Sequence, residues 1–258
     1  MSRLRPGGRA SLVIPAFDER GRVESAIAGI AAWRRTRPGE FDWEVIVVDD
    51  GSTDDTGGLA RRAAQAAGLP IEIVRHERNR GKGAAIRTGV LASSGDPVLV
   101  SDTDLSTPLT EWVKLAERLP THPIAIGSRA VDEALVRKRQ PFYRQFMGKS
   151  FNTFVRLLAV PGIRDTQCGF KLFRGDVARD LFSRARIDRF AYDVEILYLA
   201  RQRGIPIAEV PVLWFNSPES KVAVVRDSLR MLRDLLRIRW IHRGRKTENR
   251  KRETAGES

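Results

Sequence analysis

The chain has 258 residues, of which 42% are hydrophobic, so it can form one large α/β domain or two small ones and is not disordered throughout. Its net charge of +13 predicts a surface that attracts phosphate groups in nucleotides, nucleic acid or anionic lipids. The single cysteine, Cys168, excludes an internal disulfide. We expect neither a signal peptide nor a transmembrane helix, because no uncharged stretch approaches the roughly 20 apolar residues that a span requires.

Strands and helices are predicted to alternate along the first half of the chain. Apolar runs rich in β-branched residues indicate strands, and apolar residues three or four positions apart indicate helices. Strands are predicted over 11–17, 43–48, 71–76, 98–101 and 124–126, and helices over 20–35, over 54–67 with Asp54 as N-cap, after the stretch NRGKG, and from Pro108. This alternation predicts an open, doubly wound, mostly parallel sheet, which binds ligands beyond the carboxyl ends of its strands.

The second half of the chain is less regular. Phe142, Phe146, Phe151 and Phe154 recur at near-helical spacing. A strand is predicted over 166–173, a helix over 192–203, an extended segment over 205–215 and a long amphipathic helix over 222–239. The charged tail beyond residue 240 is predicted to be disordered.

Two carboxylates follow the fourth predicted strand, in the stretch VSDTDLSTP. Asp102 and Asp104 would repel one another, and a divalent cation bound between them would cancel that repulsion. Mg²⁺ and Mn²⁺ prefer oxygen ligands and are commonly shared between protein carboxylates and a substrate's phosphates. The same residues also fit a solvated turn with helix-capping aspartates.

Three other strand ends carry polar or glycine-rich stretches. In VVDDGSTDDT, Asp50 could accept hydrogen bonds from a base or ribose, and Gly51 permits a tight turn. In PAFDE, Glu19 could face a nucleotide or begin a helix as a first-turn acid. In NRGKGAAIRTG, Lys82 and nearby backbone amides could cradle a phosphate, although a solvated loop explains the composition equally well. Neither a Walker A motif nor a Rossmann glycine fingerprint is present.

Taken together and in this order, PAFDE, VVDDGSTDDT, NRGKGAAIRTG, SDTDLSTP and GSR resemble the family-2 glycosyltransferases with the GT-A fold. The resemblance covers residues 11–239. The later stretches RDTQCGFKLF, FAYDVEILYLA and SPESK…RDSLRMLRDLLRIR are similar to the dolichyl-phosphate β-glucosyltransferase branch, which is close to the dolichyl-phosphate mannose synthases. This implies a metal-dependent enzyme, using Mg²⁺ or Mn²⁺, that moves a hexose from a nucleotide sugar to a polyprenyl phosphate with inversion.

The resemblance also divides the chain. It implies a nucleotide-binding half over 11–129 and an acceptor half with amphipathic helices over 130–239, between a tail over 1–10 and a basic tail over 240–258. Mannose synthases usually carry Gln where Ser106 stands and Arg where Phe215 stands. These departures favour UDP-glucose over GDP-mannose as the donor.

Residue roles follow from the same resemblance. The residues that match the nucleotide-sugar site are Pro15, Ala16, Phe17, Glu19, Val48, Asp50, Lys82, Asp102 and Thr103. Asp102 and Asp104 match the metal ligands. The catalytic set is Asp104, Arg129, Lys171 and Lys221. Acceptor contacts are expected from Arg137, Lys138, Arg139, Gln167, Asp193 and Glu195.

A lipid phosphate is already largely anionic near neutral pH, because its second pKa is roughly 6. Asp193 and Glu195 are therefore interpreted as structural or acceptor-orienting groups rather than as a general base. His76, His122 and His242 are isolated in sequence and are not predicted to bind a metal. Cys168 is predicted to pack rather than to act as a nucleophile.

The lipid acceptor implies a cytoplasmic protein that is peripheral at the inner face of a membrane, with a membrane-protein partner as a possibility. Segments 136–158 and 222–239 mix cations with apolar residues and fit either a membrane surface or the cover of a core.

Other functions stay open from sequence alone. They are transfer to a soluble or glycan acceptor, nucleotidyl transfer, and nonspecific binding of nucleic acid. The second lacks its glycine-rich loop after the first strand, and the third lacks recognition motifs, so no specific nucleic-acid partner is expected.

Overall fold

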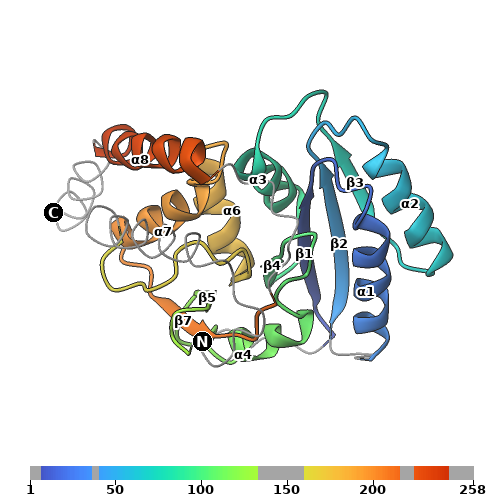
Figure 1. Cartoon of the computed structure of the whole chain (residues 1–258). Helices are drawn as coiled ribbons and strands as arrows, with labels where there is room; N and C mark the ends of the chain where they lie inside the picture. The colour runs from blue at the N-terminus through green and yellow to red at the C-terminus, as the bar shows by residue number, and fades with distance from the viewer. Residues whose placement is uncertain (1–6, 37–40, 133–159, 216–223, 244–258) are drawn as a thin grey trace, which may run out of the picture.

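A seven-stranded sheet with helices on both faces forms the centre of the molecule (Figure 1). The structure is a computed structural model that describes residues 7–36, 41–132, 160–215 and 224–243, with the backbone alone over 224–232. In spatial order the strands are β3 (Glu72–Arg75), β2 (Asp42–Asp49), β1 (Arg9–Ala16), β4 (Val98–Val100), β6 (Lys171–Phe173), β5 (Ile124–Ser128) and β7 (Ile207–Pro211).

All neighbouring strands of this sheet run parallel except at β6, which pairs antiparallel with both β4 and β5. The predicted doubly wound, mostly parallel sheet is therefore confirmed. Because β6 runs against its neighbours, its first residue lies at the edge of the sheet where β4 and β5 end. That edge also receives the ends of β1 and β2.

The helices cover the two faces of the sheet separately. They are α1 (Val23–Arg35), α2 (Thr56–Ala66), α3 (Lys82–Ala92), α4 (Trp112–Ala116), α6 (Gly175–Arg184), α7 (Tyr192–Gln202) and α8 (Val224–Ile241), with a 3₁₀ turn over Leu109–Glu111. Alternate strand residues point to opposite faces. Accordingly Leu12 and Ile14 of β1 pack in one core with α1, α2 and α4, whereas Val13 packs in a second core with α3, α6 and α7.

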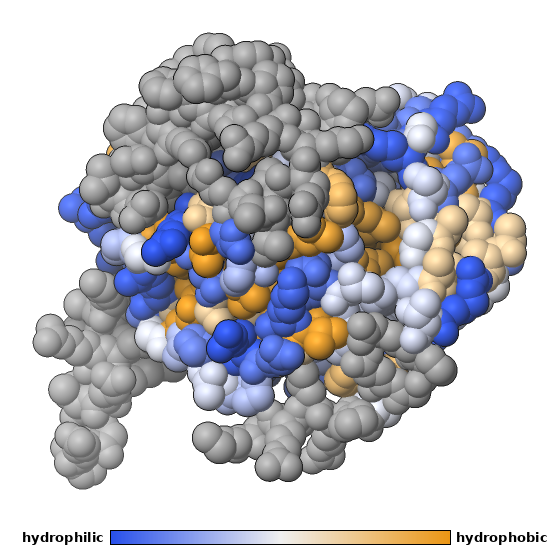
Figure 2. Space-filling model, turned by 60° about the horizontal axis from the view of Figure 1, so that its bottom comes forward, coloured by the Kyte–Doolittle hydropathy of each residue, from blue (hydrophilic) through white to orange (hydrophobic). Residues whose placement is uncertain are grey.

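Figure 1 shows α8 beside α7, at the end of the molecule away from α1 and α2. Leu235 and Ile238 of α8 are buried in the second core. Figure 2, in which the bottom of the view in Figure 1 comes forward, shows hydrophilic and hydrophobic residues interspersed over the described surface. Across the described ranges, no helix is both long enough and apolar enough to cross a membrane.

Three local expectations differ from the structure. Only Lys171–Phe173 of the predicted strand 166–173 is a strand, because the preceding loop is held by its own polar contacts to Asp165. The helix α6 was not predicted at all. The second helix begins at Thr56 rather than after Asp54, since Asp54 Oδ1 accepts hydrogen bonds from the backbone and hydroxyl of Thr56 and forms a turn before it.

Candidate active site

The aspartates of SDTD stand at the carboxyl end of β4, beyond three fully buried strand residues. Thr103 between them is buried, and its hydroxyl donates a hydrogen bond of 2.5 Å to the carbonyl of Pro15 at the end of the adjacent β1. Asp104 Oδ1 accepts a hydrogen bond of 2.9 Å from the Ser106 amide, and Leu105 takes a φ of 46°. The turn leaves Asp102 partly exposed and Asp104 exposed.

An ion pair joins this turn to the glycine–lysine stretch. Lys82 Nζ lies 2.6 Å from Asp102 Oδ1. Partial burial acts to raise the pKa of the Asp102 carboxyl, but the Lys82 ammonium, aided by Lys171 and Arg129, outweighs it and holds that pKa below its usual range. Burial likewise acts to lower the pKa of Lys82, and the carboxylates, with Asp102 foremost, raise it. Both groups are therefore charged at neutral pH.

The turn that carries Lys82 is held in place by hydrogen bonds to Asp50. The Asp50 carboxylate is buried and accepts hydrogen bonds from the amides of Arg80 at 3.0 Å and Gly81 at 2.7 Å. His76 Nδ1 lies 2.6 Å from the same carboxylate, and its Nε2 lies 3.0 Å from the hydroxyl of Thr88. Asp50 thus links the end of β2 to the start of α3. The nucleoside contact predicted for Asp50 stays a prediction, and its partners here are residues of the chain.

Antiparallel β6 brings the RDTQCGFK stretch to the same edge. A Cβ atom added to Gly169 would lie 2.6 Å from Cγ of Asp102, so the glycine makes room for that carboxylate. Lys171 is the first residue of β6. Its ammonium lies 2.5 Å from Asp193 Oδ1 and also contacts the carbonyl of Cys168, and only 2% of its side chain is exposed.

The Lys171–Asp193 pair is therefore buried behind the surface of the site. Burial raises the pKa of the Asp193 carboxyl, and Lys171, together with Lys82, opposes that effect. Because the Lys171 ammonium is already bonded and enclosed, we interpret it as the partner of Asp193. The direct contact with substrate phosphate that the resemblance implied stays a prediction.

Arg129 stands just beyond the end of β5 and is held by a second carboxylate. Its Nε and Nη2 donate to Asp165 at 2.7 and 2.9 Å, and its amide donates to the same group at 3.0 Å. The guanidinium carbon lies 5.4 Å from the ring centre of Trp214. Burial acts to lower the pKa of Arg129, but Asp165 raises it. About 30% of the Arg129 side chain remains exposed at this edge.

The other predicted residues fall into three groups. At and after the end of β1 lie Pro15, Ala16, Phe17 and Glu19. The Pro15 carbonyl contacts the SDTD turn and the Glu19 amide donates to Thr56, whereas the Val48 side chain is fully buried in the core. Gln167 lies in the loop before β6, and Glu195 is fully buried in α7. Outside the described residues lie the predicted residues Arg137, Lys138, Arg139 and Lys221, the whole of segment 136–158, and the tail beyond 243.

Asp102 and Asp104 are chemically suited to a divalent cation. They offer carboxylates two positions apart at an accessible edge. Among the described residues no group of three or more His, Cys, Asp or Glu side chains is placed to hold a metal, so a cation here would need ligands from a substrate as well. Mg²⁺ and Mn²⁺ are often held by one or two carboxylates while substrate phosphates complete the coordination. The donor set therefore fits a cation that is bound together with a diphosphate.

Sequence reasoning missed the contributions of His76, Gly169 and His242. His76 and His242 each bond a buried carboxylate, Asp50 and Glu195 respectively, and nothing in the local sequence marks those pairs. Gly169 could have been noticed as a glycine inside the predicted strand 166–173, since a glycine in a strand interior often marks a close approach of another group.

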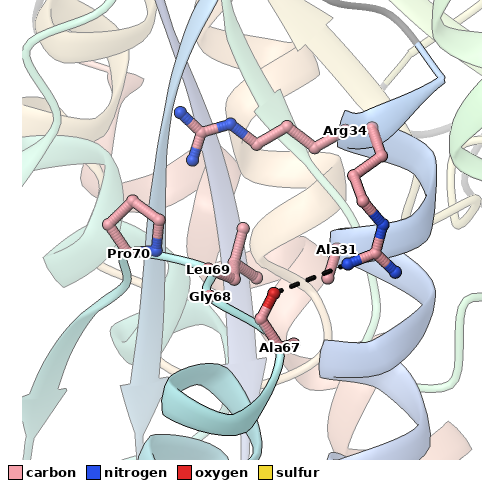
Figure 3. Close-up of a pocket in the computed structure, with 7 residues that line it drawn as sticks. Ala31, Arg34, Ala67, Gly68, Leu69 and Pro70 are labelled. Atoms are coloured by element: carbon pink, nitrogen blue, oxygen red, sulfur yellow. Dashed lines mark hydrogen bonds between the residues drawn. The ribbon is translucent and has the colours of Figure 1, made fainter.

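A pocket of about 350 Å³ lies away from this edge, between the last turns of α1 and α2 (Figure 3). Its lining includes Arg34, Arg35 and the segment from Ala67 to Pro70. Arg35 donates to the Ala67 carbonyl at 3.5 Å, and Arg34 lies 3.6 Å from the Asp42 carboxylate. Because these cations already have partners and α1 and α2 end at the amino ends of the strands, the pocket is not part of the candidate site.

Comparison with known proteins shows which family this chain matches. A family model described as glycosyl transferase family 2 matches residues 11–182. A dolichyl-phosphate β-glucosyltransferase from Homo sapiens is 38% identical over 245 residues, which cover 91% of this chain and 76% of that protein. The enzyme of the same name from Dictyostelium discoideum is 37% identical over 241 residues, 89% of this chain and 73% of that protein.

Solved structures agree with the fold. Glucosyl-3-phosphoglycerate synthase from Mycobacterium tuberculosis, in complex with Mn²⁺, UDP and glucosyl-3-phosphoglycerate, is 24% identical with a TM-score of 0.64, covering 89% of this chain and 80% of that one. Mannosyl-3-phosphoglycerate synthase from Rubrobacter xylanophilus is 19% identical with a TM-score of 0.67, covering 90% and 74%. The expected GT-A architecture is confirmed.

Proposed function

Because this chain belongs to glycosyltransferase family 2, we propose that it moves glucose from UDP-glucose to a polyprenyl phosphate such as dolichyl phosphate, with Mg²⁺ or Mn²⁺ as cofactor. One observation carries the proposal. Asp102 and Asp104 follow β4 at the edge of the sheet where β1, β2 and β5 also end, and the Lys82 ammonium lies 2.6 Å from Asp102. Relatives more than 30% identical over about 90% of the chain bear the name of this reaction.

The nucleotide sugar would lie across the ends of β1 and β4. Asp102 and Asp104 would hold the cation, which when bound supplies positive charge to the leaving diphosphate. Lys82 is the described cation closest to those carboxylates. It would exchange part of its contact with Asp102 for a diphosphate oxygen and so neutralise charge that develops as the sugar leaves.

The acceptor phosphate needs no general base, since it is already anionic near neutral pH. Its oxygen would attack the anomeric carbon from the side opposite UDP, so that the new glycosidic bond forms as the bond to the diphosphate breaks and α becomes β. Two anionic substrates must then approach one another. Arg129, partly exposed beyond β5, would favour that approach, and Lys171 would act by holding Asp193 in place.

A transfer assay tests the proposal. Purified protein is incubated with radiolabelled UDP-glucose, dolichyl phosphate in detergent and Mn²⁺, and label is counted in the butanol-extractable lipid. We expect label in lipid, its loss on adding EDTA, and at least a 100-fold loss in Asp104→Asn with an unchanged circular dichroism spectrum. A matched control is Asp132→Asn, which removes an exposed aspartate that follows β5 instead of β4.

Three results would contradict separate parts of the proposal. Label confined to water-soluble product would rule out the lipid acceptor and favour a glycan or other soluble acceptor. Transfer from GDP-mannose but not from UDP-glucose would rule out the donor. Full activity in the presence of EDTA would rule out the cation.

A further inference from the structure

The turn that carries Lys82 rests on a segment of the second half of the chain. Residues 185–189 lie between α6 and α7, and the Ala84 amide donates a hydrogen bond of 3.0 Å to the Asp188 carbonyl. A Cβ added to Gly83 would lie 2.6 Å from the Ile187 carbonyl oxygen, and one added to Gly81 would overlap the Asp188 carbonyl. Both glycines are therefore needed for this close contact between the two backbones.

Side chains of α3 strengthen the same contact. Arg87 lies one turn beyond the glycines, and its Nη2 is 2.6 Å from Asp188 Oδ1. Its Nη1 also donates to the Ala185 carbonyl at 3.4 Å. Backbone and side-chain contacts thus both join the start of α3 to the 185–189 segment.

The 185–189 segment is itself held by one buried carboxylate. Glu195, in the first turn of α7, is fully buried. Its two oxygens accept hydrogen bonds from the amides of Arg186, at 2.9 and 3.0 Å, and Ile187, at 2.8 Å. Oε1 also lies 2.8 Å from Nε2 of His242, and because a carboxylate only accepts, the imidazole donates.

We propose that Glu195 is a positioning residue for Lys82. Its carboxylate fixes the backbone of 185–189, which supports the Gly81–Gly83 turn and so sets the Lys82 ammonium beside Asp102. This inference rests on the proposed function, in which Lys82 binds the diphosphate. Removing the carboxylate leaves two buried amides and an imidazole without their acceptor, and the segment must move or admit water to satisfy them.

A double-mutant cycle on UDP affinity tests the connection. Isothermal titration with UDP and Mn²⁺ is carried out on the full chain and on Glu195→Ala, Lys82→Ala and the double variant. We expect Glu195→Ala to weaken UDP binding at least about tenfold and to add little in the Lys82→Ala background, since both changes remove the same contact. Losses that multiply in the double variant would overturn the proposal.

Two variants separate positioning from general destabilisation. Glu195→Gln keeps one acceptor oxygen, and its amide can donate to His242, whose Nδ1 has no described partner and can take the proton, so UDP affinity should largely return. Ile30→Ala removes core volume from the opposite face of the sheet and should lower the melting temperature without changing UDP affinity. Equal losses of UDP affinity in Ile30→Ala and Glu195→Ala would show that Glu195 acts only through stability.

Hydrogen exchange keeps the proposal testable if the proposed function is wrong. Should the wild-type chain bind no UDP, the nucleotide assignment fails, whereas Glu195 can still be examined without ligand. We expect Glu195→Ala to speed amide exchange at Ala84 and Ile187 while leaving α2 unchanged. Unchanged exchange at Ala84 would overturn the positioning role by itself.

Discussion

At the scale of single residues, Gly169 tests how closely the site is packed. A methyl group there would overlap the Asp102 carboxylate, which would have to turn away and so change its position relative to Lys82. We expect Gly169→Ala to lower kcat/KM for glucosyl transfer about 100-fold while the melting temperature falls only slightly. Gly21→Ala is the matched control, because a methyl group there meets no atom within 4 Å. Wild-type turnover in Gly169→Ala would show that Asp102 need not hold its position.

Cys168 gives a prediction for alkaline pH. Burial raises the pKa of its thiol to about 11, above the value near 9 of an unfolded cysteine. Between these two values the unfolded chain loses the thiol proton while the folded chain keeps it. The free energy of unfolding should therefore fall as pH rises from about 9 to 11, and this contribution is fully present below pH 9.

The measurement compares melting temperatures of wild type and Cys168→Ala from pH 7 to 11. The comparison matters because burial raises the pKa of Tyr192 well above 10. The unfolded chain therefore loses this proton before the folded chain does, which lowers the stability of both proteins in part of the same range. The wild type should lose more stability than the variant above pH 9. Parallel curves for the two proteins would contradict a buried, protonated thiol.

The sequence predicted where the site residues lie better than it predicted which side chains they contact. Asp102 and Asp104 were placed at a strand end from the apolar run before them, and the structure confirms that place. The partners of Asp50, Arg129 and Asp193 could not be predicted in the same way. Each partner lies more than 20 residues away in sequence, and only the folded chain brings the pairs together.

At the scale of elements, the sequence did not predict whether each strand runs parallel or antiparallel to its neighbours. Apolar runs located the parallel strands to within a few residues, but an apolar run reads the same in a parallel and an antiparallel strand. β6 has only three residues and runs antiparallel, which is why Gly169 and Lys171 reach the end of β4. The helix α6 carries apolar residues on one face, Ala178, Leu181 and Phe182, at the spacing that is typical of a helix with one buried side.

The link between β2 and α3 also belongs to this scale. Asp50 carries the connection, since its carboxylate accepts hydrogen bonds from two amides of the loop before α3 and contacts His76. We expect Asp50→Ala to lower the free energy of unfolding by about 3 kcal/mol without nucleotide, because it leaves buried donors unsatisfied.

Chemical denaturation measures this effect, and Glu77→Ala serves as a control at an exposed carboxylate of the loop before α3. A change below about 0.5 kcal/mol in Asp50→Ala would show that the loops are held by other contacts. The predicted nucleoside contact would then be the only role left for Asp50.

At the scale of the whole molecule, both cores cover one sheet, and α8 closes the second of them. Sequence periodicity predicted this helix, and its described turns bury Leu235 and Ile238 against α7. Periodicity could not predict which apolar residues of α8 would remain exposed to solvent. Leu236 is 59% exposed and Trp240 is 73% exposed, one helical turn apart on the outer side of α8.

This exposed pair predicts where the molecule would contact a membrane. Arg233 and Arg237 are exposed on the same stretch of α8, so the surface combines apolar side chains with cations, as interfacial helices do. We expect the protein to sediment with vesicles that contain anionic phospholipid, and to do so less as salt rises. Leu236→Ser with Trp240→Ser should reduce the bound fraction several-fold. Leu91→Ser, at a leucine of α3 that is 46% exposed, should not. Equal binding by the double variant and wild type would move the membrane contact away from this part of α8.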